Sequence, residues 1–87
     1  MIEKNVLVDN PTGLNAKTAA LLVQVAGKFS SNIWIKKEDK RVNAKSIIAL
    51  MSLAISKGTD ITIEAEGEDE QLAINELTEL FQFGLGD

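Results

Sequence analysis

Residues 60–66 read Asp-Ile-Thr-Ile-Glu-Ala-Glu and alternate polar with apolar side chains along their whole length. This period of two residues predicts a β-strand whose two faces meet different surroundings. The residues expected to face the core are Ile61, Ile63 and Ala65. The residues expected to face water are Thr62, Glu64 and Glu66. A strand with one wet face is typical of an antiparallel sheet that is covered on only one side.

The neighbouring segments supply the other elements of such a fold. Hydrophobic periodicity and turn-forming residues predict strands over 2–8, 32–37 and 41–43, and helices over 15–27, 47–53 and 69–83. The resulting order, β-α-β-β-α-β-α, is typical of a two-layer α+β domain. The chain contains no internal repeat and no linker, so we expect residues 1–87 to form a single domain.

The ends and buried faces of the helices follow from particular side chains. Asn15 and Ser46 stand directly before two predicted helices, where a side-chain oxygen can accept a bond from a free backbone N–H. The first helix is expected to bury Ala16, Ala19, Ala20, Val23 and Ala26. The last helix is expected to bury Ala73, Leu77 and either Leu80 or Phe81, and to stop at Gly84.

A hairpin is predicted to join the strands over 32–37 and 41–43. Lys37-Glu38-Asp39-Lys40 is expected to form a tight turn, although it lacks the glycine that such turns favour. Trp34 is expected on the open face of the sheet, because Ile33 and Ile35 occupy the alternate positions that face the core.

Composition narrows the classes of function. The chain has no histidine and no cysteine, which argues against a disulfide framework, a zinc site and thiolate chemistry. A net charge of −4 argues against direct nucleic-acid binding. No apolar run resembles a signal peptide or a membrane helix. We therefore expect a cytoplasmic protein that is not an enzyme and needs no cofactor or metal.

Two stretches resemble the HPr family of bacterial phosphocarriers. Residues 13–20, Gly-Leu-Asn-Ala-Lys-Thr-Ala-Ala, are similar to the Gly-Leu-His-Ala-Arg-Pro-Ala loop of that family. Residues 42–53, Val-Asn-Ala-Lys-Ser-Ile-Ile-Ala-Leu-Met-Ser-Leu, are similar to its regulatory-serine segment. The resemblance runs from the first strand to the final helix. It implies an HPr-like open-faced two-layer sandwich, with a four-stranded antiparallel sheet and three helices on one face.

In this resemblance, Asn15 occupies the position of the histidine that carries phosphate. The amide nitrogen of Asn15 shares its lone pair with the carbonyl group, so it cannot replace an imidazole as a nucleophile. Lys17 stands in place of the family's arginine and lacks its bidentate geometry. Thr18 stands in place of a proline and is expected to be a surface residue. We therefore predict no catalytic residue and no phosphate carriage at Asn15.

Ser46 matches the family's regulatory serine. The chain is similar in type to the histidine-lacking Crh proteins of bacilli. This resemblance implies phosphorylation of Ser46 by HPr kinase/phosphorylase. The phosphoprotein would then bind a repressor of the catabolite control protein A type. A phosphate at a helix N-terminus meets free N–H donors, and Lys40 and Lys45 are expected to offset part of its charge.

The residues expected to form the partner-binding surface are Asn15, Lys17, Ser46, Ile47, Ile48 and Met51. The last three lie on a helix too short to bury all of its apolar side chains, and an exposed apolar patch marks a protein-binding surface. The alternative is a constitutive module that docks on a sugar-uptake or metabolic enzyme without phosphorylation. A homodimer that uses the surface around Trp34 also remains open.

Overall fold

The computed structural model describes residues 1–85. Its elements are β1 (Ile2–Leu7), α1 (Ala16–Ala26), β2 (Asn32–Lys37), β3 (Lys40–Asn43), α2 (Ile47–Met51), β4 (Asp60–Glu66), α3 (Glu70–Glu79) and the π-helical turn η1 (Leu80–Gly84). The order is the predicted one. Two helices end differently from the prediction. The helix expected over 47–53 ends at Met51, and the last helix changes to π geometry at Leu80.

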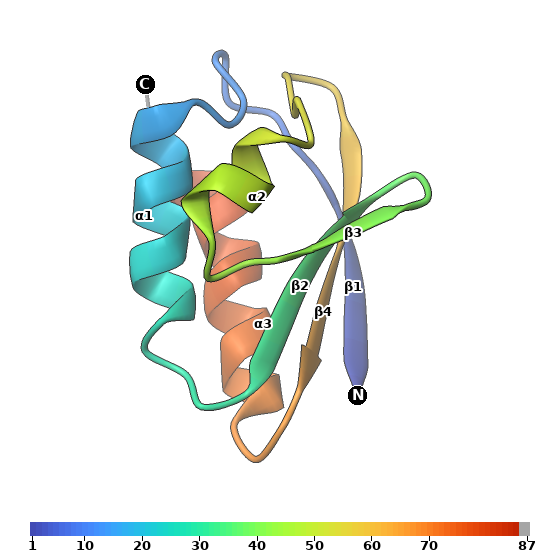
Figure 1. Ribbon diagram of the computed structural model, residues 1–87, viewed down its shortest axis with the longest axis vertical. Helices are drawn as coiled ribbons and strands as arrows, with labels where there is room; N and C mark the ends of the chain where they lie inside the picture. The colour runs from blue at the N-terminus through green and yellow to red at the C-terminus, as the bar shows by residue number, and fades with distance from the viewer. Residues whose placement is uncertain (86–87) are drawn as a thin grey trace.

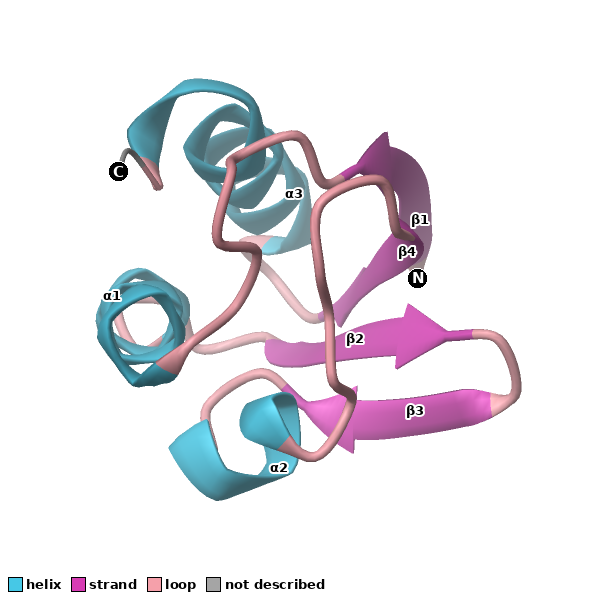
Figure 2. Cartoon of the chain, turned by 90° about the horizontal axis from the view of Figure 1, so that it is seen from above, coloured by secondary structure: helices cyan, strands magenta, loops and turns pink. Residues whose placement is uncertain are grey.

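The sheet is antiparallel throughout, with the strand order β1-β4-β2-β3. In the register between the two central strands, Ile35 lies opposite Ile63 and Trp34 lies opposite Glu64. The helices cover one face of the sheet and leave the other face open, as the view from above shows (Figure 2). The expected open-faced α+β sandwich with a four-stranded antiparallel sheet is therefore confirmed.

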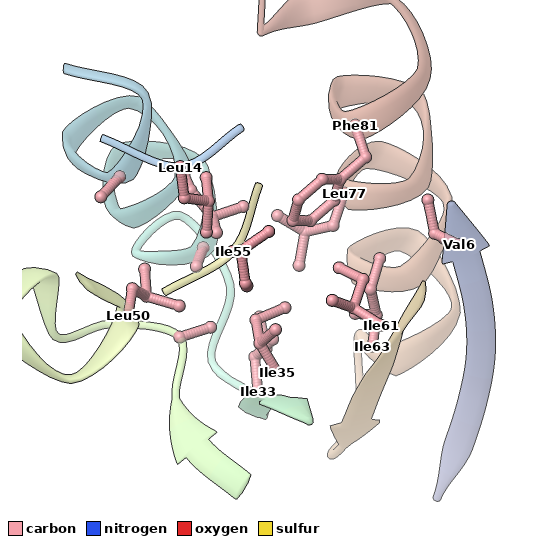
Figure 3. Packing of buried hydrophobic residues seen from close by; sticks show 14 of the residues in the cluster. Val6, Leu14, Ile33, Ile35, Leu50, Ile55, Ile61, Ile63, Leu77 and Phe81 are labelled. Carbon is pink, nitrogen blue, oxygen red and sulfur yellow. The ribbon is translucent and has the colours of Figure 1, made fainter. Parts of the chain in front are cut away.

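The hydrophobic core lies between the sheet and the helices (Figure 3). Its central strand residues are Ile33, Ile35, Ile61 and Ile63. From α3 and η1, the core receives Ala73, Ile74, Leu77 and Phe81. Of the two residues left open by the sequence, Phe81 is buried and Leu80 is only half-buried. These side chains fix the helix layer over the middle of the sheet.

The buried face of α1 differs from the expected one. The helix buries Thr18, Ala19, Leu22 and Ala26, whereas Ala16 is exposed and Ala20 and Val23 are half-buried. Both sets of residues have helical spacing. Because nearly every residue of this helix is apolar or small, the sequence did not determine which of the two faces would turn inward.

The open face of the sheet carries a buried charge that the sequence assigned to water. Glu64 is buried, and its Oε1 accepts a bond from Nε of Arg41 at 2.6 Å. The Arg41 guanidinium lies 3.8 Å from the centre of the Trp34 ring, which helps to cover the ion pair. Glu3 lies directly opposite Glu64 in the register between β1 and β4. Arg41 therefore compensates a carboxylate that faces a second carboxylate across the sheet.

The turn between β2 and β3 forms at the predicted residues although it contains no glycine. Glu38 has φ 55°, the left-handed conformation that a glycine would supply at no steric cost. The predicted turn at 37–40 is thus confirmed, and its missing glycine is replaced by a residue under backbone strain.

The connection between α1 and β2 is held by one carboxylate at the start of α3. Asp69 accepts bonds from the backbone N–H groups of Ser30 at 2.9 Å and Ser31 at 3.0 Å, and from the Ser31 hydroxyl. The bond from the Ser31 hydroxyl and then that from the Ser30 backbone lower the pKa of Asp69 from its ordinary value of 3.8 to about 2. Asp69 therefore joins the two loops most strongly in its ionised form.

Candidate functional site

Asn15 begins α1 and closes a reciprocal capping box. Its Oδ1 accepts a bond from the backbone N–H of Thr18 at 3.0 Å, and its own backbone N–H donates to the Thr18 hydroxyl at 2.8 Å. Two of the donors left free at a helix N-terminus are satisfied in this way. The predicted cap is confirmed, and the carboxamide oxygen of Asn15 points back to the helix.

Thr18 is a structural residue and not the surface residue that the sequence suggested. It is 2% exposed, and its hydroxyl donates to the carbonyl of Gly13 at 3.0 Å while accepting from Asn15. The cause lies in the loop before α1, where Gly13 has φ 61° and turns its carbonyl toward the helix. A proline here would supply neither the N–H nor the hydroxyl. Asn15 and Thr18 therefore form a matched pair.

Lys17 projects from the first turn of α1 and is exposed. It lines the rim of an apolar hollow of about 240 Å³ together with Leu21, Gln24 and Leu85. A cation at this end of the helix and an apolar hollow beside it make a surface that an amphipathic protein segment can contact.

Ser46 is the N-cap of α2, as predicted. Its Oγ accepts a bond from the backbone N–H of Ala49 at 3.3 Å, and the residue is half-buried. The hydroxyl proton donates no bond to another described residue. Ser46 therefore presents a hydroxyl at the edge of the surface, directly before the exposed residues of α2.

The two lysines expected beside Ser46 have other partners. Lys45 donates through Nζ to the carbonyl of Phe29 at 2.8 Å, just after the end of α1. Lys40 donates to the carbonyl of Ser52 at 3.3 Å, at the opposite end of α2 from Ser46. The expectation that Lys40 lies near Ser46 is wrong, because the hairpin carries its side chain to the C-terminal end of that helix.

Ile47, Ile48 and Met51 lie on the outer side of α2. Ile48 is 84% exposed, and Met51 and Ile47 are 45% and 39% exposed. Leu50 is the buried residue of the helix and fixes it to the core. A helix of five residues thus anchors one side chain and exposes three large apolar ones.

Asn15 is the N-cap of α1 and Ser46 is the N-cap of α2, and the two helices lie side by side (Figure 1). The loop before Asn15 pairs with the segment after α2, where the N–H of Leu14 donates to the carbonyl of Ile55 at 3.0 Å. Ser46 follows Lys45, which is bonded at the other end of α1. A helix of 11 residues is about 16 Å long. The expected partner-binding residues therefore form one extended surface along α1 and α2, and not a compact pocket.

Sequence reasoning missed Lys37 as a residue of this region. Its Nζ donates to the carbonyls of Leu53 and Ala54, just after α2. The sequence could have indicated this from the alternation of the strand, because Lys37 occupies the next inward-facing position after Ile33 and Ile35.

The described residues give no sign of a metal centre or a membrane span. Over residues 1–85, no group of three or more His, Cys, Asp or Glu side chains is placed to hold a metal ion. Within the same range, every helix is too short or too polar to cross a bilayer.

Comparison with known proteins identifies the family. The family model for the PTS HPr component phosphorylation site matches residues 2–82. The HPr-like protein Crh of Halalkalibacterium halodurans is 56% identical over 77 residues, which cover 88% of this chain and 92% of the relative. The HPr-like protein Crh of Bacillus subtilis is 50% identical over 82 residues, which cover 94% of this chain and 96% of the relative.

Solved structures agree with these relatives. The crystal structure of HPr-C-His from Thermoanaerobacter tengcongensis has a TM-score of 0.95 at 48% identity, covering 100% of this chain and 98% of the other. Crh of Bacillus subtilis, crystallised as a domain-swapped dimer, has a TM-score of 0.77 at 50% identity and covers 94% of each chain. HPr and Crh are phosphocarrier or regulatory proteins rather than catalysts, and both have been seen as dimers. The chain belongs to the HPr family and is an HPr-like protein of the phosphotransferase and catabolite-repression type.

Proposed function

We propose that the chain is a non-carrier HPr-like regulator of carbon catabolite control. HPr kinase/phosphorylase phosphorylates Ser46, and the phosphoprotein binds a transcription repressor of the catabolite control protein A type. The observation that carries this proposal is the arrangement of α2, in which a cap hydroxyl immediately precedes the exposed Ile47, Ile48 and Met51.

The state of Asn15 supports the absence of carrier chemistry. A phosphocarrier needs a side-chain nitrogen with an available lone pair, and the amide of Asn15 has none. Its oxygen caps the helix, so the side chain has a complete structural role. The chain has no histidine that could take over. Asn15 and Lys17 then contribute contacts to a partner instead of phosphate transfer.

The position of Ser46 supports a phosphate that the fold tolerates. A phosphoserine adds about −1.5 to −2 charge at neutral pH and favours a helix N-terminus, where the helix dipole is positive. The ammonium of Lys45 is held beside Phe29, and no described carboxylate bonds to Ser46. Phosphorylation should therefore change the charge of the docking surface while leaving α2 folded.

The apolar part of the surface supports recognition by a protein. Ile47, Ile48 and Met51 are exposed together on one short helix, and a cluster of exposed apolar side chains marks an interaction site. A partner that presents an apolar groove and cations near the Ser46 position would meet both features, since arginine pairs well with phosphate.

Mass measurement tests this proposal. The chain is incubated with ATP and HPr kinase/phosphorylase, and separately with phosphoenolpyruvate and enzyme I, beside a histidine-bearing HPr as a positive control. We expect one phosphoryl group from ATP, lost in Ser46→Ala and retained in Ser52→Ala, a matched change on the same surface. No gain from ATP under conditions that modify the control would contradict the proposal.

The alternative is a constitutive binding module on a sugar-uptake or metabolic enzyme. One observation favours it: Ile48 and Met51 are exposed in the unphosphorylated chain, so docking does not depend on their release. Partner binding that is equal with and without phosphate on Ser46 would select this alternative.

Homodimer formation is a further part of the proposal. The domain-swapped Crh of Bacillus subtilis supports it, and β1 is an edge strand of the sheet, paired only with β4. Light scattering over a range of protein concentrations tests it, and a monomer at every concentration would contradict it.

A further inference from the structure

We propose that Lys37 and Lys40 form a clamp that holds the C-terminal end of α2 and so positions its exposed apolar residues for docking. The docking role rests on the proposed function, whereas the clamp itself does not.

The clamp joins the β2–β3 hairpin to the backbone that follows α2. Lys37 Nζ donates to the carbonyl of Leu53 at 3.0 Å and to that of Ala54 at 3.1 Å. Lys40 Nζ donates to the carbonyl of Ser52 at 3.3 Å. The three acceptors belong to the C-cap residue Ser52 and to the two residues after it, beside a helix end that carries partial negative charge. Two ammonium groups therefore meet the end of the helix where cations are favourable.

α2 needs support that its own hydrogen bonds do not provide. It has five residues, and a helix this short is not stable by itself in water. Leu50 anchors its middle in the core, and Ser46 caps its start. In the segment that follows α2, Ala54 has φ 52°, a left-handed conformation that alanine rarely adopts. The carbonyl of this strained residue is one of those that Lys37 holds.

The placement of Lys37 is specific to this role. Ile33 and Ile35 face the helix layer and are fully buried, and Lys37 continues their alternation at the end of β2. Its side chain therefore emerges beneath α2 at a position where the pattern favours an apolar residue. Lys36 points to the open face of the sheet, is exposed, and bonds to none of the described carbonyls. It provides a matched control within the same strand.

The clamp affects docking through the position of the last turn of α2. Met51 is the last residue of the helix, and Ile47 and Ile48 lie on the turn before it. When the end of the helix frays, these side chains no longer form one fixed surface. The apparent affinity for a partner falls in proportion to the fraction of molecules that keep the docking conformation.

Hydrogen exchange of the free chain tests the clamp directly. The double variant Lys37→Met, Lys40→Met keeps most of each aliphatic stem and removes both ammonium groups. We expect the protected amides within residues 50–54 to exchange about tenfold faster in this variant, with unchanged exchange in β4. Lys36→Met should leave both regions unchanged. The affinity of the Ser46-phosphorylated double variant for the repressor should fall in proportion to the fraction of molecules that remain closed over residues 50–54, a fraction that the exchange rates give.

Three results would count against these statements. Unchanged exchange within residues 50–54 would overturn the clamp. Repressor affinity that does not follow the closed fraction given by the exchange rates would overturn the role of the clamp in docking. Absence of repressor binding by the phosphorylated wild-type chain would contradict the proposed function instead, and the exchange rates would still decide whether the clamp exists.

Discussion

Replacing Thr18 by proline should remove the role of Asn15 as a helix cap. In the wild-type chain, the cap bond runs from the backbone N–H of Thr18 to Asn15 Oδ1 at 3.0 Å. Asn15→Ala should therefore destabilise the fold by about 1 kcal/mol. Proline lacks the N–H, so in a Thr18→Pro background the same Asn15→Ala change should cost close to nothing. The coupling energy between the two positions is then about 1 kcal/mol.

Thr18→Val is the matched control for this cycle. It keeps the backbone N–H and removes only the hydroxyl that bonds Gly13 and the Asn15 N–H, at a cost of about 1–3 kcal/mol. In this background, Asn15→Ala should still cost about 1 kcal/mol. Comparing the Thr18→Val and Thr18→Pro backgrounds separates the stability contributed by the backbone N–H of residue 18 from that contributed by its hydroxyl.

Urea unfolding followed by the fluorescence of Trp34 measures all of these variants, because Trp34 is the only tryptophan. With an m-value of about 1 kcal/mol/M, Asn15→Ala should lower the wild-type midpoint by about 1 M. Equal costs of Asn15→Ala in the wild-type, Thr18→Val and Thr18→Pro backgrounds would refute the capping box.

Three further changes test other contacts. Arg41→Leu should destabilise the fold by about 1–3 kcal/mol, because it leaves the Glu64 carboxylate buried without its charge partner; a cost near zero in urea unfolding would contradict the ion pair. The stability that Asp69 contributes should be complete above pH 3.8 and be lost as the pH falls through about 2. Acid unfolding should accordingly be shallower in Asp69→Asn, and an identical pH profile would count against the bonded carboxylate. Ile48→Ala should change stability by less than about 0.5 kcal/mol but weaken partner binding at least about tenfold, whereas Leu72→Ala, at another exposed apolar residue, should leave binding unchanged.

The strands and caps were predictable because their signals are local. The bounds of β2 and β4 follow from alternating isoleucines, since a shift of one residue would turn the apolar face to water. Asn15 and Ser46 act as caps because each directly precedes an apolar helix. Their contribution to partner binding stays a prediction.

Several of the errors concern contacts between residues far apart in the chain. Glu64 was assigned to water because its partner Arg41 lies 23 positions away and the period of the strand does not report it. Lys37 was taken as part of a turn because its acceptor Leu53 lies 16 positions away. The buried face of α1 was predicted wrongly because the helix carries apolar side chains on more than one face. Tertiary packing therefore determines which face is buried.

The affinity of one repressor for the phosphorylated and unphosphorylated chain, measured side by side, tests the regulatory role most directly. Phosphate must first be confirmed on Ser46 by mass, with Ser46→Ala treated with the same kinase as the reference for non-specific effects. We expect the phosphorylated chain to bind clearly more tightly than both the unphosphorylated chain and the variant. Equal affinities for all three would contradict a switch at Ser46 and support a constitutive binding module.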